Sequence, residues 1–295
     1  MKILVTGGNG FIGKALCKKL KEAHKVASYD LPDCNILDHQ FLELCISEVD
    51  LVVHCAAVAD LNISLINQDM NFDVNIRATF DIARLCAEHK KKLVFISTCC
   101  VYGDSVSTCS DTPLHSVPMC REPYACSKVA GEYILRGTPG LDYVILRIGT
   151  VYGPGMREAL FNYIALKKVL SGETIDIFGS GEQSRQYIYI DDLVDGISLA
   201  VDKFTEASMK TLNVCGLEKV SVLWTIQTAE LLTGRTAIMR KAPARFGDTL
   251  EEDISCAETH LVLGWWAKVK YFEGMKRTLY GDERLKALLL KERVG

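Results

Sequence analysis

The sequence predicts an α/β fold, in which a doubly wound parallel sheet is followed by a smaller, partly discontinuous C-terminal lobe. Three observations indicate this. Short apolar runs alternate with segments of helical periodicity, a glycine-rich turn directly follows the first run, and the pattern becomes less regular after Gly153. A chain of 295 residues can bury a large core, either as one domain or as a nucleotide domain with a companion.

Five apolar runs predict short buried strands, at residues 3–5, 26–29, 51–54, 93–97 and 144–148. The segments between the later runs carry helical periodicity, so strand and helix alternate and the strands are expected to be parallel. The connection from Asp30 to Leu51 is short and holds one helix-like stretch, near residues 41–46. We therefore expect a trimmed crossover between the second and third strands.

The chain beyond Gly153 is expected to form the smaller lobe. It includes a glycine turn at residues 179–181, a helix-like stretch at 222–233 and a terminal stretch at 271–292. We assign residues 1–155 and about 186–203 to the nucleotide-binding domain, and residues 156–185 and 204–295 to the substrate-binding lobe. No repeat or long charged linker separates them, so the two parts should pack around a shared cleft.

Charge and cysteine usage favour a small-molecule partner. A formal net charge of −3 and a pI near 6.1 give no electrostatic case for nucleic acid or an anionic membrane. No apolar run approaches the roughly 18 residues of a membrane span, and a strand beginning at Lys2 leaves no room for a signal peptide. The twelve cysteines show neither a Cys-x-x-Cys pair nor zinc-ligand spacing. We expect a cytoplasmic protein with reduced thiols and no metal site.

A glycine-rich turn lies between the first predicted strand and a helix. Gly7, Gly10 and Gly13 are spaced so that the backbone can approach a pyrophosphate, whose charge the free N–H groups and the helix dipole stabilise. Gly13 also permits close packing of the helix on the strand. Such turns also occur without a ligand, but the strand and helix on either side predict a Rossmann-type dinucleotide site.

Asp30 narrows the cofactor to NAD. It ends the second predicted strand, about 17 residues beyond Gly13, where a carboxylate can accept hydrogen bonds from the adenosine ribose hydroxyls. The same charge would repel a 2′-phosphate, and no arginine follows it, so NAD is favoured over NADP. The alternative is that Asp30 caps a helix or turn.

Tyr124 and Lys128 lie one helical turn apart, in a segment that Pro123 introduces as a helix start. A tyrosine with an ordinary pKa of about 10 is a poor base at neutral pH, but a nearby lysine and a positive nicotinamide ring stabilise its phenolate. Tyr124 can then remove a proton from a substrate hydroxyl while hydride leaves for NAD. The same spacing occurs in ordinary surface helices, so its context decides between the two interpretations.

Seven blocks in order resemble the extended short-chain dehydrogenase/reductase family, and in particular its NAD-dependent nucleotide-sugar epimerases. They are residues 6–13, 54–57, 75–79, 97–103, 124–128, 146–154 and 189–192, so the resemblance covers nearly the whole chain. It implies that Lys128 also contacts the nicotinamide ribose. It further implies cofactor contacts from Phe11, Ile12, Ala56, Ala57 and Asn75, and from Asn35 and Ile36 at the adenine edge. Asn35 stands where an aspartate is usual.

Thr98 is the hydroxyl catalyst that the resemblance implies, four residues before the tyrosine of the Val-Tyr-Gly element. It would hydrogen-bond the reacting oxygen. Nucleotide-sugar dehydratases carry an Asp-Glu pair directly after this position, whereas this chain has Cys99 and Cys100, which lack the carboxylate acid that the elimination needs. We therefore argue against a dehydratase. We interpret both cysteines as small packing residues, with a strained vicinal redox pair as the alternative.

Besides Thr98 and Tyr124, four further residues are candidates for contacts with the substrate. Arg185 and Arg245 lie in segments that resemble those whose arginines bind a nucleotide-sugar diphosphate, a task that suits the planar guanidinium. Thr150 stands where many sugar epimerases have asparagine, and Arg157 follows Gly-Pro-Gly. This combination resembles the UDP-glucuronate epimerase branch, in which such groups attend the sugar carboxylate. The alternative is that these arginines are solvated surface charges with no role in binding.

The leading hypothesis is an NAD-dependent nucleotide-sugar 4-epimerase. It would invert C4 of a UDP-hexose or UDP-hexuronate through a transient 4-keto sugar, with no net redox change. One alternative is an NAD-dependent sugar or alcohol dehydrogenase or reductase, and another is a non-catalytic NAD-sensing protein. The resemblance also implies a homodimer formed by helices that include residues 124–128. The sugar and the nucleotide base stay open.

Overall fold

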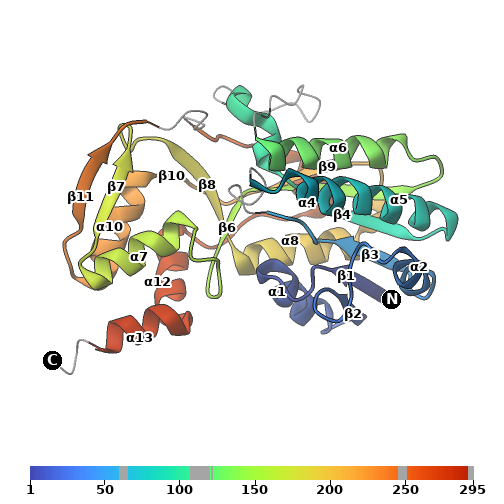
Figure 1. The fold of residues 1–295 in the computed structure, drawn as a ribbon, viewed down its shortest axis with the longest axis horizontal. Coiled ribbons are helices and arrows are strands. Elements are labelled where there is room, and N and C mark those ends of the chain that lie inside the picture. Colours follow the sequence, from blue (N-terminus) through green and yellow to red (C-terminus); the bar gives the residue numbers. More distant parts are fainter. Residues whose placement is uncertain (60–65, 107–119, 121, 245–250, 292–295) are drawn as a thin grey trace.

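A six-stranded parallel sheet forms the core of the larger of two lobes (Figure 1). The computed structural model describes residues 1–59, 66–106, 120, 122–244 and 251–291. All neighbouring strands of this sheet are parallel, and the first five strands in the chain are the five that the apolar runs predict. In spatial order they are β2 (Lys25–Tyr29), β1 (Lys2–Thr6), β3 (Leu51–His54), β4 (Lys92–Thr98), β5 (Asp142–Ile148) and β9 (Thr211–Val214).

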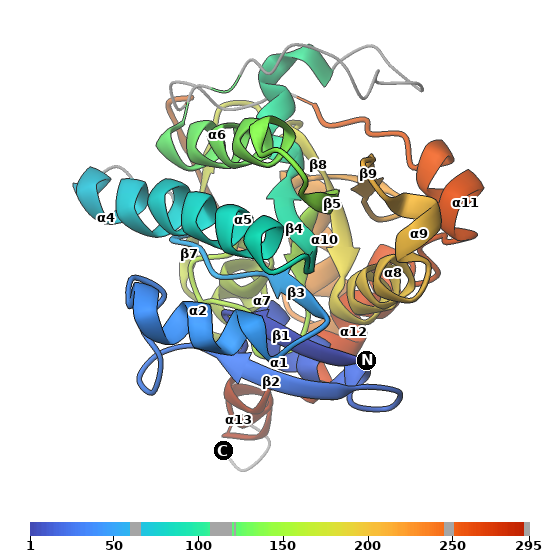
Figure 2. The same cartoon turned by 90° about the vertical axis from the view of Figure 1, so that its right-hand side faces the viewer.

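Helices cover both faces of this sheet, which confirms the doubly wound fold (Figure 2). On one face α1 (Phe11–Leu20) packs against α8 (Ile190–Asp202), and on the other α5 (Ala78–Glu88) packs against α2 (His39–Ser47) and α6 (Pro123–Gly137). Apolar side chains of β1 alternate between the two resulting cores, because Ile3 and Val5 join one cluster and Leu4 the other. Every strand between two helix layers must be apolar on both faces, which explains the continuous apolar runs.

The crossover between β2 and β3 is short, as predicted. It contains one helix, α2, whose start Asp38 caps by accepting a hydrogen bond from the backbone N–H of Phe41 at 3.2 Å. Because the next strand joins the other side of β1, β2 stays at the edge of the sheet. Ala27 and Ser28 are therefore exposed.

Among the described residues, the smaller lobe combines two small sheets with four helices. The predicted helix at residues 222–233 is α10, whereas the terminal stretch divides at Asp282 into two helices. The strands are β6 (Thr150–Tyr152), β8 (Ser184–Tyr189) and β10 (Lys219–Ser221) in one sheet, and β7 (Thr174–Phe178) and β11 (Ile238–Ala242) in the other. The helices are α7 (Phe161–Ser171), α10 (Val222–Thr233), α12 (Tyr271–Gly281) and α13 (Glu283–Lys291).

Shorter helical elements complete the two lobes. They are α4 (Gln68–Phe72), a π-helical turn at Asp73–Arg77, a 3-10 segment at Cys99–Val106, α9 (Phe204–Ala207) and α11 (Ala257–Leu263). The sequence placed residues 204–295 in the smaller lobe, yet β9 pairs with β5, and α11 packs on β9. A four-residue strand carries too little periodicity to be recognised in the sequence. The other boundaries of the domain division stay predictions.

Candidate active site

The glycine turn joins β1 to α1 at the carboxyl end of the sheet. The backbone N–H of Gly7 donates to the carbonyl of Tyr29 at 3.0 Å, and that of Gly10 donates to the carbonyl of Gly7 at 3.1 Å. A Cβ on Gly13 would lie 2.0 Å from the carbonyl oxygen of Gly7, so only glycine lets α1 pack this closely on the turn. Gly7 itself has a φ of +71°, which also favours glycine.

The N-terminus of α1 is suited to an anion. Gly10 is its N-cap, with no side-chain capping hydrogen bond, and the first turn holds no acidic residue. The first N–H groups of a helix have no partner within the helix, and its dipole places positive charge there. A turn that excludes side chains and ends at such a terminus fits a pyrophosphate.

Asp30 lies at the end of β2, beside the glycine turn. One carboxylate oxygen accepts a hydrogen bond from the backbone N–H of Asn9 at 2.9 Å, and the other accepts from that of Leu31 at 2.8 Å. Asp30 therefore caps the turn, as the alternative interpretation supposed. A carboxylate offers about four acceptor positions, so two remain for ribose hydroxyls. The two interpretations of this residue are compatible.

The segment after β3 packs against the glycine turn. A Cβ on Gly7 would lie 2.7 Å from the backbone nitrogen of Ala56, and Ala56 and Ala57 are half-buried. Asn35 accepts a hydrogen bond from the hydroxyl of Tyr29 at its carbonyl, at 3.1 Å. Ile36 is partly buried against the core that α2 covers.

Asn75 holds the segment after β3 in place. Its side-chain oxygen accepts from the backbone N–H of Val58 at 2.8 Å, and its amide nitrogen donates to the carbonyl of Val58 at 3.2 Å. The same nitrogen donates to Asn71 at 2.6 Å and to the hydroxyl of Ser127 at 3.0 Å. These protein contacts occupy the amide, so they support a structural role for Asn75; the direct contact with NAD stays a prediction.

Helix α6 carries the predicted tyrosine and lysine. It begins with Pro123 at its first turn, as the sequence predicts. The Lys128 ammonium donates to the carbonyl of Ile96 at 2.9 Å and lies 4.8 Å from the centre of the Phe95 ring. Lys128 is 2% exposed, and burial lowers its pKa to about 8, although Cys55 and Glu132 act in the opposite direction. Lys128 therefore carries its charge at neutral pH.

Cys100 and Arg157 both act electrostatically on the phenol of Tyr124, the other predicted residue of α6. The pKa of the Tyr124 phenol lies above its ordinary value because burial disfavours the phenolate; Cys100 acts in the same direction and Arg157 opposes it. Thr98 ends β4, is 6% exposed and accepts a hydrogen bond from the backbone N–H of Cys100 at 3.2 Å. A phenol with a raised pKa needs positive charge nearby to act as a base at neutral pH.

The two adjacent cysteines face different surroundings. Cys99 is buried, and its sulfur lies 3.2 Å from the sulfur of Cys215. Cys100 is half-buried, and burial raises the pKa of its thiol to about 12, with Glu252 adding to the rise. Cys99 thus packs in the core, which supports the packing interpretation for that residue.

The structure places three of the four substrate candidates. Thr150 opens β6 and pairs in register with Tyr187 of β8. Arg157 is exposed, and its guanidinium donates to the carbonyl of Ala59 at 2.9 Å. Arg185 lies 3.4 Å from the carboxylate of Glu252, which is buried. Arg245 lies outside the described residues.

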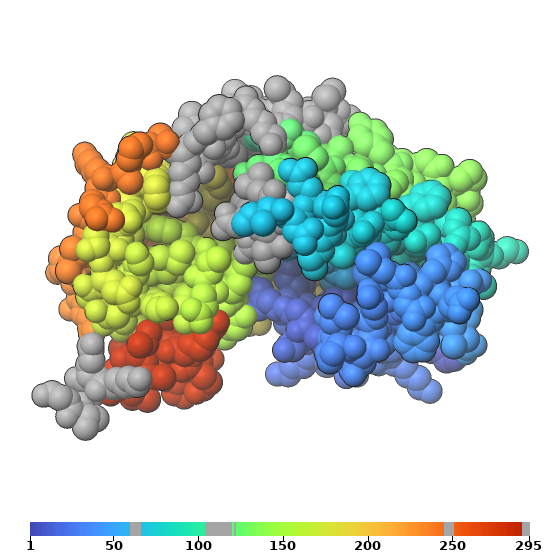
Figure 3. All heavy atoms as spheres, viewed as in Figure 1, coloured from blue at the N-terminus to red at the C-terminus, as the bar shows by residue number. Residues whose placement is uncertain are grey.

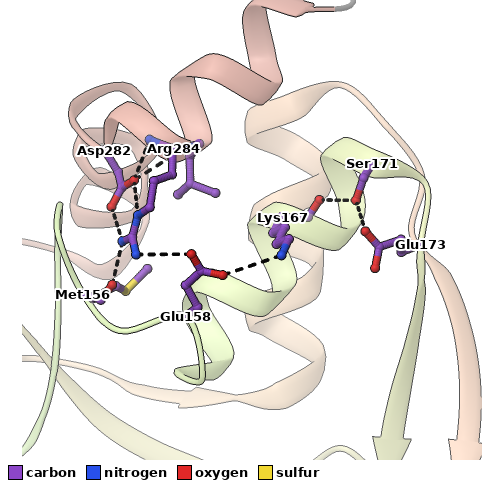
Figure 4. Close-up of polar contacts among 8 residues, drawn as sticks. Met156, Glu158, Lys167, Ser171, Glu173, Asp282 and Arg284 are labelled. Carbon is purple, nitrogen blue, oxygen red and sulfur yellow. Dashed lines mark hydrogen bonds and ion pairs between the residues drawn. The ribbon is translucent and has the colours of Figure 1, made fainter.

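The loop that carries Arg157 is anchored to the C-terminal helices (Figure 4). Asp282, between α12 and α13, accepts a hydrogen bond from the backbone N–H of Gly155 at 2.8 Å. Arg284 donates to Asp282 at 2.7 Å and to the carbonyl of Met156 at 2.6 Å, and also lies 3.6 Å from Glu158. These contacts fix the loop where the two lobes meet.

A groove of about 740 Å³ lies along α1 and α8, which supply most of its walls. Asn9 of the glycine turn, Pro154 and Gly155 of the anchored loop and Tyr189 at the end of β8 complete it, whereas Thr98, Tyr124 and Lys128 do not line it. Figure 3 shows the surface hollowed between the two lobes, beside the dark blue N-terminal segment. This groove does not contain the predicted catalytic residues, so the shared cleft between the lobes stays a prediction.

Comparison with known proteins identifies the family. The model of the NAD dependent epimerase/dehydratase family matches residues 3–215. The chain belongs to this family. An uncharacterized UDP-glucose epimerase, YtcB, from Bacillus subtilis (strain 168) is 32% identical over 271 residues, which cover 81% of this chain and 84% of the relative. The crystal structure of UDP-glucuronic acid 4-epimerase from Bacillus cereus, in complex with UDP-glucuronic acid and NAD, superimposes with a TM-score of 0.89 at 26% identity, covering 98% of this chain and 100% of that one.

Relatives with other reactions belong to the comparison as well. A dTDP-D-glucose 4,6-dehydratase from Dictyostelium discoideum is 28% identical over 242 residues, covering 68% of this chain and 56% of that protein. A UDP-N-acetyl-alpha-D-glucosaminuronate decarboxylase from Bacillus cytotoxicus is 25% identical over 259 residues, covering 79% of this chain and 80% of that protein. Membership of the NAD-dependent epimerase/dehydratase family therefore establishes an enzyme class and its cofactor, NAD, but not one reaction.

Two features are absent from the part of the chain that the structure describes. No helix there is long and apolar enough to cross a membrane. No group of three or more His, Cys, Asp or Glu side chains in the same residues could hold a metal ion.

Three buried charged residues near the site were not predicted from the sequence: Glu132 on α6, Arg147 on β5 and Glu252. Glu132 follows Lys128 by four residues, so helical spacing places it on the same face and gave a signal. Arg147 interrupts an apolar strand, which also indicates a buried partner. Glu252 has no comparable signal, because its partner Arg185 lies far away in the sequence.

Proposed function

We propose that the protein is an NAD-dependent nucleotide-sugar 4-epimerase that inverts C4 of a UDP-hexose or UDP-hexuronate through a transient 4-keto sugar. The observation that carries the proposal is the buried, charged Lys128, one turn from Tyr124 on α6 and bonded to β4 two residues before Thr98. Solved relatives that superimpose over nearly the whole chain contain UDP-sugars, which supports this substrate class.

The residues of the chain have separate roles in this reaction. NAD, when bound at Gly7, Gly10, Gly13 and Asp30, supplies reversible oxidation at C4. Tyr124 takes the proton of the C4 hydroxyl and returns it after the sugar has turned in the cleft. The Lys128 ammonium stabilises the Tyr124 phenolate, and the Thr98 hydroxyl donates a hydrogen bond to the reacting oxygen.

The thiols after Thr98 support epimerisation over elimination. Dehydration of a sugar needs an acid and a base beside the ring, which the dehydratase Asp-Glu pair supplies. Cys99 is buried against Cys215, and Cys100, with a pKa of about 12, stays a neutral thiol at pH 7. Neither side chain provides a carboxylate in that position.

Arg157 and Thr150 support a hexuronate among the possible sugars. The Arg157 guanidinium acts on the Tyr124 phenol electrostatically, so its charge reaches the candidate reaction centre. A positive charge there suits a sugar carboxylate. Arg185 and Arg245 would hold the diphosphate, with Glu252 as the partner of Arg185 in the free enzyme.

We also propose a homodimer through α5 and α6. Exposed aromatic side chains lie on neighbouring helices here: Phe72 on α4, Phe80 on α5 and Tyr133 on α6 are each at least half exposed. Apolar side chains gathered on adjacent helices favour burial against a second copy. Light scattering should give twice the chain mass, and Phe80→Ser should lower it; a monomeric wild-type protein would contradict this.

An epimerase assay tests the reaction. The purified protein is incubated with UDP-, CDP- and GDP-sugars without added reductant, and epimers are resolved chromatographically. Tyr124→Phe and Thr98→Val should each lower turnover about 100-fold or more. Tyr280→Phe, at an exposed tyrosine of α12, is the matched control and should leave turnover unchanged.

The outcomes separate the rival functions. Full activity in Tyr124→Phe would refute the mechanism. Steady accumulation of NADH with a single substrate would instead support a dehydrogenase or reductase. Tight NAD binding without turnover of any nucleotide sugar would support a non-catalytic NAD-sensing protein.

A further inference from the structure

A buried carboxylate, Glu132, lies where three elements of the candidate active site meet. It is 1% exposed, one turn after Lys128 and two turns after Tyr124, on the same face of α6. One carboxylate oxygen accepts from the hydroxyl of Ser97 at 2.6 Å and from Nε of Arg147 at 2.9 Å. The other oxygen accepts from the same guanidinium at 2.7 Å. The carboxylate therefore joins α6 to both β4 and β5.

The two strand residues lie side by side. Ser97 and Arg147 are partners in the parallel register of β4 and β5, with Thr98 and Ile148 as the next pair. Ser97 directly precedes Thr98, so a hydrogen bond from Ser97 to Glu132 fixes the end of β4 against α6. The hydrogen bond from Ser97 to Glu132 thus connects β4, which ends at Thr98, to α6, which carries Tyr124.

Helix α6 also approaches β4 closely at this level. A Cβ on Gly131 would lie 2.7 Å from the ring of Phe95, so glycine permits the contact. The Lys128 ammonium contacts the same part of β4, since it donates to the carbonyl of Ile96 and lies 4.8 Å from the centre of the Phe95 ring. The close contact at Gly131 and the hydrogen bond from Ser97 to Glu132 therefore both determine how α6 packs on β4.

Stability alone does not explain an ion pair in this place. Glu132 and Arg147 are 1% and 2% exposed, and the Arg147 guanidinium lies 4.7 Å from the centre of the Tyr102 ring. Removing two charges from water costs as much as their attraction returns, so apolar side chains of similar volume give comparable stability. A bidentate pair differs from an apolar contact because it defines distance and direction.

We propose that Glu132 is a positioning residue, which sets Thr98 at the end of β4 in its place relative to Tyr124 and Lys128 on α6. The inference rests on the proposed function for the reaction that this placement serves. The placement itself rests on the contacts of Glu132 with Ser97 and Arg147.

The charge of Glu132 has a second effect on Lys128. The groups that act on the Lys128 ammonium are Cys55 after β3 and Glu132 on α6. Lys128 in turn acts on His54 of β3, whose pKa is lowered to about 3, chiefly by burial. His54 is therefore neutral. Around Glu132 lie Arg147 from β5 and Arg136 and Lys128 from α6. Removing the carboxylate charge should lower the pKa of Lys128 further, because an attractive charge is lost.

Three variants separate positioning from bulk stability. Ser97→Ala removes only the hydrogen bond from β4 to Glu132, and Glu132→Gln removes the negative charge of the carboxylate. Arg136→Gln removes a third partner of Glu132, an arginine whose side chain is 33% exposed. We expect Ser97→Ala and Glu132→Gln to lower kcat about 10-fold or more with KM changed less than about threefold. The alkaline limb of the kcat profile should move to lower pH in Glu132→Gln alone. Arg136→Gln should match wild type.

A spectroscopic measurement makes the test independent of turnover. The NAD-loaded protein is labelled with 3-fluorotyrosine, and the Tyr124 resonance is assigned as the one that Tyr124→Phe removes. Its ¹⁹F shift should change in Ser97→Ala and Glu132→Gln and stay constant in Arg136→Gln. If Glu132→Gln fails to fold, Glu132→Gln combined with Arg147→Met removes both buried charges and should show the same changes.

The results distinguish the two proposals. An unchanged kcat and an unchanged Tyr124 resonance in Ser97→Ala and Glu132→Gln would overturn the role of Glu132. Resonance changes in those two variants, with no turnover of nucleotide sugars by the wild-type protein, would support the positioning role and reject the proposed reaction.

Discussion

Replacing Lys128 by methionine is expected to stabilise the folded protein while removing its activity. Burial lowers the pKa of Lys128 from an ordinary 10.5 to about 8, a difference of about 2.5 units. At 1.36 kcal/mol per unit, keeping this ammonium charged costs the folded state about 3 kcal/mol. Methionine preserves the apolar stem but leaves the carbonyl of Ile96 without its donor, which costs about 1 kcal/mol. The expected net gain is about 2 kcal/mol.

The gain should depend on pH in a defined direction. Below pH 8 the ammonium is charged in both folded and unfolded chains, so the full cost applies. Between pH 8 and 10.5 the folded lysine releases its proton while the unfolded one keeps it. The unfolded chain then binds more protons, so the wild-type free energy of unfolding rises with pH. The advantage of Lys128→Met is therefore largest below pH 8 and shrinks towards pH 10.5.

Urea denaturation of wild type and Lys128→Met near pH 7 and near pH 10 measures the difference between their free energies of unfolding. At neutral pH the variant should be more stable by about 2 kcal/mol, or about 4–8 °C in Tm, and should lack turnover. Lys276→Met, at an exposed lysine of α12, is the control and should show no such pH-dependent difference. A variant that is less stable than wild type at pH 7, or a difference that is equal at both pH values, would refute the reasoning.

Three other experiments address the cofactor turn, the lobe anchor and the thiols. Gly13→Ala places a Cβ 2.0 Å from a carbonyl oxygen, so calorimetry should show a loss of about 1–3 kcal/mol together with weaker NAD retention; Gly137→Ala, with no atom within 4 Å, should leave both unchanged. The pKa of Asp282 lies below its ordinary value because, against burial, the neighbouring arginine and a backbone N–H stabilise the carboxylate. The ionised carboxylate therefore contributes to the free energy of unfolding above the ordinary pKa range of aspartate, and this contribution is lost as the pH falls. Asp282→Asn should be less stable than wild type at pH 7, and the difference in stability should narrow in urea titrations at acid pH. Iodoacetamide should modify exposed Cys126 before Cys86, whose pKa burial raises to about 12; equal rates by mass spectrometry would contradict this.

Local pattern was sufficient to predict the sheet and the cofactor turn. Strands packed between two helix layers must be apolar along their length, so β1, β3, β4 and β5 are visible as apolar runs. Glycines that no other residue can replace can also be recognised in the sequence from their spacing, and Gly13 is one of them. Both signals arise within a few neighbouring residues.

Contacts between distant segments were not predictable in this way. β9 has four residues and gains its place only by pairing with β5. The resemblance implied a contact of Asn75 with the cofactor, which stays a prediction, but it gave no sign that the amide also bonds to Val58, Asn71 and Ser127. A motif identifies a position that matters, whereas the partner of its side chain depends on how the segments pack.

The path of the chain between the lobes limits how they can move and unfold. The chain leaves the larger lobe after β5, returns with α8 and β9, leaves for β10, and returns once more with α11. A hinge motion between the lobes would therefore require several connections to bend together. Melting one lobe would remove covalent restraints on the other, so the protein should give one cooperative calorimetric transition. Ligands that bind either lobe should protect backbone amides from hydrogen exchange in both.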